Sequence, residues 1–181
     1  MSNENLSLII TVALAFIGYL ATYLNSLRLS KRREQLDLLD KRIKEFYGPL
    51  YVSSEVGKIA YETLLEKLGK KAVFDPDFPP TEEELTEWRV WSKCVFFPLN
   101  EFREKLILEN AYLIREEKMP DCLLRFVTHA SAYKAILEKW ELGNFSENTP
   151  ALDFPVELVE YSAYSYRELK AEQLKLIGKS K

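Results

Sequence analysis

Hydrophobic and polar positions divide the chain into a short apolar stretch and a long amphipathic part. The apolar stretch, LSLIITVALAFIGYLATYL, occupies residues 6–24, and its 19 residues carry no charge. As an α-helix it would span roughly 28 Å, close to the hydrocarbon thickness of a bilayer. The leader contains Glu4 but no basic residue, and Ala21-Thr22-Tyr23 is a poor cleavage site. The pattern therefore favours an uncleaved transmembrane anchor over a signal peptide.

One face of the anchor carries only small or polar residues, spaced alternately by four and three positions. Small residues let transmembrane backbones approach closely, whereas large apolar residues suit a helix contact in water. We expect one helix over residues 6–46 whose seam supports self-association; the alternative is that the soluble half of the seam packs on its own bundle. The candidate seam comprises Thr11, Ala15, Gly18, Thr22 and Asn25, continued in the same register by Leu29, Leu36, Leu39 and Ile43.

The middle of the chain predicts further helices. Gly48 and Pro49 are expected to end the first helix and begin a second one over residues 49–68, because Gly suits a C-terminal cap and Pro a first helical turn. Gly57 within it would allow a close helix crossing. The proline-rich segment 70–80 predicts a loop, since its prolines forbid regular structure.

Capping signals place the next helix. Thr81 and Glu84 have the spacing of a capping box, with Thr81 as N-cap. Pro98 is expected to kink or divide the helix that follows, and Asn100 to cap a new segment that runs to residue 114.

Two more helices are expected in the last third, over residues 120–142 and 155–177. The first carries an apolar stripe at helical spacing: Cys122, Phe126, His129, Tyr133, Ile136 and Trp140. Nowhere does strand-like alternation bounded by turn residues compete with these helical periods. The sequence predicts an all-α chain, with residues 1–27 as N-terminal tail and transmembrane anchor and residues 28–181 as a cytoplasmic helical bundle.

Charge refines the topology. Arg28, Lys31, Arg32 and Arg33 follow the anchor directly. By the positive-inside bias they place the N-terminus outside and the domain in the cytoplasm, with these cations at lipid headgroups. The net charge is −3, so the chain beyond these cations is acidic and unsuited to nucleic acid. A hydrophobic content of 47% argues against disorder.

Candidate chemistry is sparse. His129 is the only histidine, and its aromatic neighbours on the stripe favour a buried structural residue, hydrogen-bonded to a hydroxyl or carbonyl, over a catalytic base. Trp140 is expected to be structural as well. Cys94 and Cys122 lack metal-site spacing and are expected in the core. We find no phosphate loop and no pairing of a nucleophile with a base, so we expect no catalytic residue, cofactor or metal, and no enzyme.

Several short strings resemble small bacterial proteins that have one N-terminal transmembrane helix and a helical cytoplasmic region. They are YGPLY at 47–51, FPLNEF at 97–102, MP at 119–120, His129, Trp140 and DFP at 153–155. The resemblance covers most of the chain and implies a bacterial inner-membrane location, with no activity to carry over.

These observations lead to two functional expectations. The first is a membrane-anchored, non-enzymatic interaction or scaffold protein, such as an accessory subunit of an inner-membrane assembly, with membrane lipid and a homo-oligomer or membrane-protein partner. The second is a regulated membrane effector in bacterial stress or phage defence.

Overall fold

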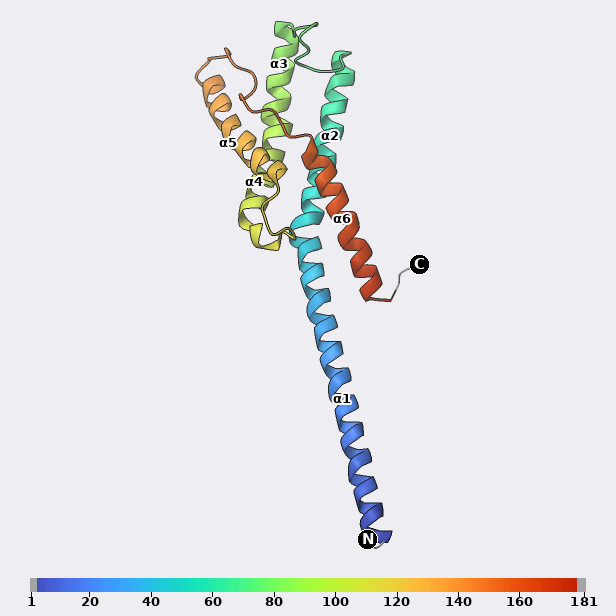
Figure 1. Cartoon of the computed structure of the whole chain (residues 1–181). Helices are drawn as coiled ribbons and strands as arrows, with labels where there is room; N and C mark the ends of the chain where they lie inside the picture. The colour runs from blue at the N-terminus through green and yellow to red at the C-terminus, as the bar shows by residue number, and fades with distance from the viewer. Residues whose placement is uncertain (1–2, 179–181) are drawn as a thin grey trace. The chain divides into compact units, whose positions relative to one another are not determined.

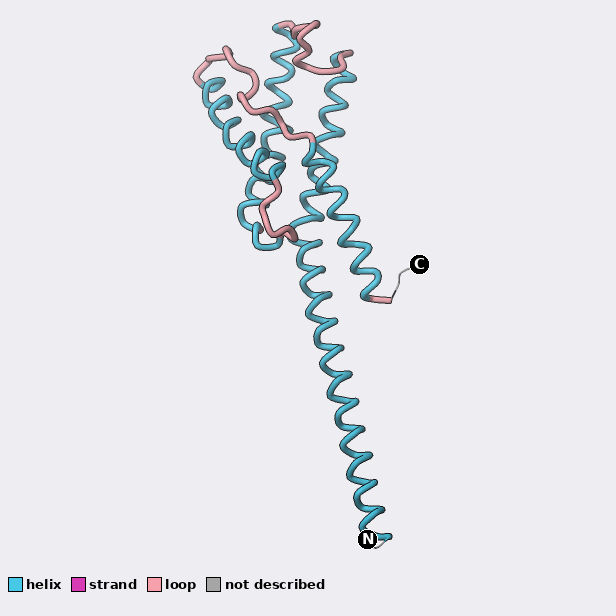
Figure 2. The backbone as a smooth tube through the Cα atoms, in the orientation of Figure 1, coloured by secondary structure: helices cyan, strands magenta, loops and turns pink. Residues whose placement is uncertain are grey.

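The structure is a computed structural model that describes residues 3–178, so residues 1–2 and 179–181 of the two predicted domains lie outside it. Every regular element within residues 3–178 is a helix (Figures 1 and 2). The prediction of an all-α chain is confirmed for this part. The α-helices are α1 (Asn3–Arg42), α2 (Gly48–Leu68), α3 (Glu82–Trp91), α4 (Phe97–Glu109), α5 (Asp121–Glu141) and α6 (Glu157–Leu176).

The chain forms two compact units. One comprises the chain up to Asp40 together with the stretch from Glu172 onward, and the other is Lys41–Ala171. In the first unit, residues 10–35 of α1 are all exposed. This helix is long and apolar enough to cross a membrane.

Two π-helical turns stand where Pro49 and Pro98 were expected to interrupt the helices. At Ile43–Tyr47 the Gly48 N–H donates to the Ile43 carbonyl, five residues back, and at Ser92–Phe96 the Phe97 N–H donates to the Ser92 carbonyl in the same way. A π-turn shifts the carbonyls past the residue that lacks an N–H, so the helix continues through each proline. The expectation that Gly48 ends the first helix is therefore wrong: its backbone is helical, with φ −66°.

Two further expectations fail for packing reasons. Asn100 does not cap a helix, because it lies buried inside α4 and accepts a hydrogen bond from Arg103. Cys94, which lies within the second π-turn, is exposed rather than in the core, and Cys122 is partly buried. The capping box is confirmed: Thr81 Oγ1 accepts from the Glu84 N–H at 3.3 Å, and Glu84 Oε2 from the Thr81 N–H at 2.7 Å.

The core of the second unit is aromatic and aliphatic. Its central cluster joins α2, α3 and α5 through Leu64, Val73, Trp88, Tyr133, Ile136 and Trp140. α5 packs against α4, and α6 meets α2 where the Tyr51 and Tyr166 rings stack at 5.0 Å (Figure 1). These helices and the loop before α6 enclose the cavity described below.

Candidate functional site

The first candidate site is the apolar surface of α1. Each large hydrophobic side chain between residues 10 and 29 is 41–68% exposed, including Leu14 at 64%. Burial of such side chains is worth about 1.5–3 kcal/mol each, and no part of the described chain supplies it here. The surface therefore needs a nonaqueous cover, which a bilayer or a partner helix can provide.

The candidate seam divides into two environments. Its members up to Leu29 are exposed, and the Thr11 and Thr22 hydroxyls donate to carbonyls of their own helix, those of Ser7 and Gly18. Beyond that point the seam is covered within the single chain: Leu36 and Ile43 are partly buried, and Leu39 is 4% exposed. The half of the seam between Thr11 and Leu29 is thus the part with a free surface.

All four predicted headgroup cations, Arg28, Lys31, Arg32 and Arg33, are exposed. Arg32 also binds protein: its Nε donates to the Leu176 carbonyl at 2.7 Å, and its Nη2 donates to the same oxygen. Leu176 ends α6, so a cation here satisfies a carbonyl left open by the helix terminus. The role of all four at lipid headgroups stays a prediction.

The second candidate site is a cavity of about 360 Å³ in the unit Lys41–Ala171. Its walls come from α2, α3, α4 and α5, from the loop after α2 and the π-turn before α4, from residues 149–154 of the loop before α6, and from the start of α6. Aromatic rings dominate the lining: Tyr61, Phe74, Trp88, Phe96, Tyr133 and Phe154. Apolar walls with a few polar groups among them are typical of small-molecule sites.

Arg103 of α4 is the buried charged group of this cavity, and it is only 2% exposed. Its Nη1 donates to Asn100 Oδ1 at 2.9 Å, its Nε to Ser53 Oγ at 3.3 Å, and its Nη2 to the Ser53 carbonyl. All these acceptors are neutral. Burial lowers the pKa of Arg103 to about 10, so the guanidinium is still protonated at neutral pH.

Two residues of α2 shape the space around this guanidinium. A Cβ on Gly57 would lie 2.3 Å from Arg103 Nη2, so the predicted close approach at Gly57 is made by an arginine side chain. Ser54 lines the same cavity and is 1% exposed, and its Oγ has no hydrogen-bond partner among the described residues.

His129 of α5 lies in the cavity wall and is buried. Its Nδ1 lies 2.7 Å from the Leu152 carbonyl oxygen. Because a carbonyl only accepts, Nδ1 carries the proton, and Nε2 of the neutral ring presents a lone pair. Burial lowers the pKa of His129 below its ordinary 6.5, against the opposing effects of the Leu152 bond and the Asp153 charge.

Trp140 is buried beyond the cavity and holds the same loop. Its Nε1–H donates to the Glu147 carbonyl at 2.8 Å, and the Trp88 Nε1–H donates to the Asn148 carbonyl at 2.9 Å. Two indoles and one imidazole thus fix the loop that closes one side of the cavity.

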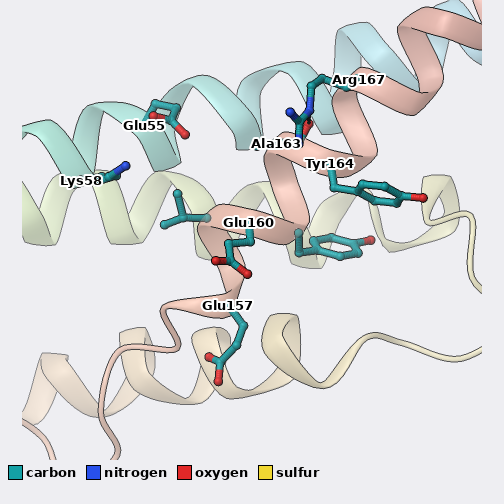
Figure 3. Close-up of a pocket in the computed structure, with 9 residues that line it drawn as sticks. Glu55, Lys58, Glu157, Glu160, Ala163, Tyr164 and Arg167 are labelled. Carbon is teal, nitrogen blue, oxygen red and sulfur yellow. Dashed lines mark hydrogen bonds between the residues drawn. The ribbon is translucent and has the colours of Figure 1, made fainter.

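A shallower groove lies next to the cavity, and Lys58 and Val159 line both. Figure 3 shows Glu55 and Lys58 of α2 facing Glu157, Glu160 and Arg167 of α6 across this groove. Its charged groups are of mixed sign and open to solvent. Among the described residues no three His, Cys, Asp or Glu side chains come together as a metal site would require.

The sequence predicted His129 as a buried structural residue and did not single out Arg103 or Ser54 at all. Arg103 stands among Glu101, Glu104 and Lys105, which is the composition of a solvated helix face. The available signal was Gly57, since a glycine inside a helix is unfavourable unless something approaches its backbone closely.

We compared the chain with protein-family models, curated proteins and solved structures. Nothing matches.

Proposed function

We propose that this chain is a single-pass, membrane-anchored and non-enzymatic interaction protein of the bacterial inner membrane. The observation that carries the proposal is the exposed apolar surface of α1 between residues 10 and 29, which the rest of the described chain leaves uncovered. The N-terminus lies outside and the helical domain in the cytoplasm, because the cations that flank the anchor follow it rather than precede it.

Membrane extraction tests the anchor. The wild-type chain should stay in the membrane pellet after carbonate washing and dissolve only in detergent. The double variant Leu14→Arg with Ile17→Arg should leave the pellet, because each arginine near the helix centre costs about 3 kcal/mol on insertion.

Val52→Arg is the matched control, since Val52 is 58% exposed on α2, outside the anchor. It should remain in the pellet. A C-terminal reporter should be active only if it works in the cytoplasm. Wild-type protein released by carbonate, or a reporter active in the periplasm, would contradict the proposal.

The cavity favours a second candidate, a regulated membrane effector that responds to a small molecule. A buried guanidinium without an acidic partner is unusual in a purely structural domain. The scaffold and effector functions can be distinguished by the phenotypes that they predict. Loss of membrane potential on overexpression, absent from the Leu14→Arg with Ile17→Arg variant, supports the effector, whereas a stoichiometric protein that co-purifies from detergent-solubilised membranes supports the scaffold.

A further inference from the structure

The cavity contains an unpaired positive charge. Arg103 has three hydrogen bonds, to Ser53 and Asn100, and none of its partners is a carboxylate. A guanidinium carries five N–H groups, so two of them have no acceptor among the described residues. The neighbouring acid, Glu104, accepts instead from Lys134 at 2.7 Å and from Ser131. The Phe126 ring lies 5.8 Å from the guanidinium carbon, but no anion among the described residues compensates the buried charge.

A second unpaired donor lines the same space. Ser54 Oγ is buried and unpartnered among the described residues, and its hydroxyl can donate to an oxygen anion. The other charges on the cavity wall are Lys58, which lies 4.0 Å from Glu62, and Asp153, which is exposed. The wall thus carries two cations and one anion, and its buried charge is positive.

The rest of the lining excludes a strongly hydrated ligand. The aromatic rings listed above surround the polar groups, and such faces favour an apolar or aromatic body. A volume of about 360 Å³ corresponds to about 12 waters, which is room for a small organic molecule. A planar carboxylate also matches the fork of a guanidinium, which can donate two parallel hydrogen bonds to it.

We propose that this cavity binds a small organic monocarboxylate with an aromatic or branched apolar body. Its carboxylate accepts hydrogen bonds from Arg103 and Ser54, and its body lies against the ring of Trp88. His129 Nε2 offers a lone pair to any hydroxyl or N–H group on the ligand. The site does not depend on membrane anchoring. A failure to bind carboxylates would therefore leave the proposed membrane function untouched, and the reverse also holds.

Binding can be measured on the full chain in detergent by titration calorimetry and by quenching of tryptophan fluorescence, to which Trp88, Trp91 and Trp140 all contribute. The probes are benzoate, phenylacetate and indole-3-acetate, each compared with its neutral amide and with inorganic phosphate. At least one carboxylate should bind ten times more tightly than its amide, because only the anion compensates the buried charge. Carboxylates no better than their amides, phosphate binding as tightly as the carboxylates, or no binding by any carboxylate would overturn the proposal.

Substitutions test which residues bind the carboxylate. Arg103→Met should weaken carboxylate binding at least tenfold and leave amide binding unchanged. Arg125→Met is the matched control, since Arg125 lies outside the cavity and pairs with Glu157 at 3.7 Å, and it should bind like the wild type. Unchanged carboxylate affinity in a folded Arg103→Met protein would overturn the assignment.

Ser54→Ala keeps the proposal testable if Arg103→Met does not fold. Ser54 Oγ has no partner to lose among the described residues, so the variant should fold normally. It should lower carboxylate affinity severalfold. An affinity equal to that of the wild type would then decide against the site.

Discussion

At the scale of single residues, burial without charge compensation distinguishes this domain. Arg103 and His129 both line one cavity, and both lie in surroundings that disfavour their charged forms. The arginine stays protonated because its ordinary pKa is far above neutrality. The imidazole stays neutral, so the two residues offer different hydrogen-bonding groups at the same pH.

The buried imidazole predicts a pH-dependent stability. Folding lowers the pKa of His129 below 6.5, so the unfolded chain binds more protons than the folded one between 6.5 and the folded pKa. The contribution of His129 to the free energy of unfolding should therefore be constant above about pH 7 and fall as the pH drops through this window. Urea unfolding at about pH 7.5 and about pH 5.5 measures the slope.

His129→Gln is the control for that slope, because an amide can still donate to the Leu152 carbonyl but does not titrate. The chain has no other histidine, so the variant should show a smaller loss of stability over the same window. Equal slopes in the two proteins would assign the pH dependence to carboxyl groups instead.

At the scale of secondary-structure elements, the sequence predicted correctly those features that depend on interactions within a single helical turn. The capping box at Thr81 was predictable because it involves only two residues, three positions apart. The side chain of each accepts a hydrogen bond from the backbone N–H of the other, whatever packs nearby. The prediction that Gly48 ends the first helix was wrong because a π-turn carries the helix through Pro49. Phe46 and Tyr47 of this turn are buried in the core. Contacts between residues far apart in the sequence, such as that of Arg103 with Gly57, can be predicted only indirectly from the pattern of hydrophobic and polar residues.

The first π-turn makes Gly48 a sensitive position. A Cβ there would lie 2.5 Å from the Ile43 carbonyl oxygen, which is backbone and cannot move aside cheaply. Gly48→Ala should lower the free energy of unfolding by about 1 kcal/mol, since overpacking of roughly 1–3 kcal/mol outweighs a gain in helix propensity of roughly 1 kcal/mol. Denaturant titration of the full chain in detergent gives the value.

Gly18→Ala provides the comparison, because a Cβ at Gly18 meets nothing within 4 Å. It should leave the unfolding of the domain unchanged. A more stable Gly48→Ala protein would show that the π-turn relaxes to an α-helix without cost.

At the scale of the whole molecule, the main feature is the exposed apolar surface of α1 between residues 10 and 29. In lipid, helix association depends on close backbone packing at small residues, not on burial of apolar area. The exposed members of the seam include Ala15 and Gly18, and their smallness would be the mechanism of a contact between two chains.

Crosslinking measures this contact directly. Cysteines introduced as Ala15→Cys and Gly18→Cys should crosslink in native membranes, in a Cys94→Ser, Cys122→Ala background because Cys94 is exposed. Gly18→Leu should abolish crosslinking at Ala15→Cys and leave insertion intact.

Ile17→Leu, on a neighbouring face, changes shape with little change of volume and should crosslink normally. Absence of crosslinks at both positions, with no effect of Gly18→Leu, would mean that the anchor does not self-associate through this seam.

The loop before α6 has a consequence for the timing of ligand exchange. One wall of the cavity is this segment, and hydrogen bonds from Trp88, Trp140 and His129 hold it to the helices. Loops move faster than packed helices, so a molecule can enter or leave through transient release of this wall while the helices stay in place. Residence time then depends on the strength of these bonds and of those that Arg89 and Tyr133 donate to Asn148, and slower amide hydrogen exchange across residues 147–154 becomes the signature of an occupied cavity.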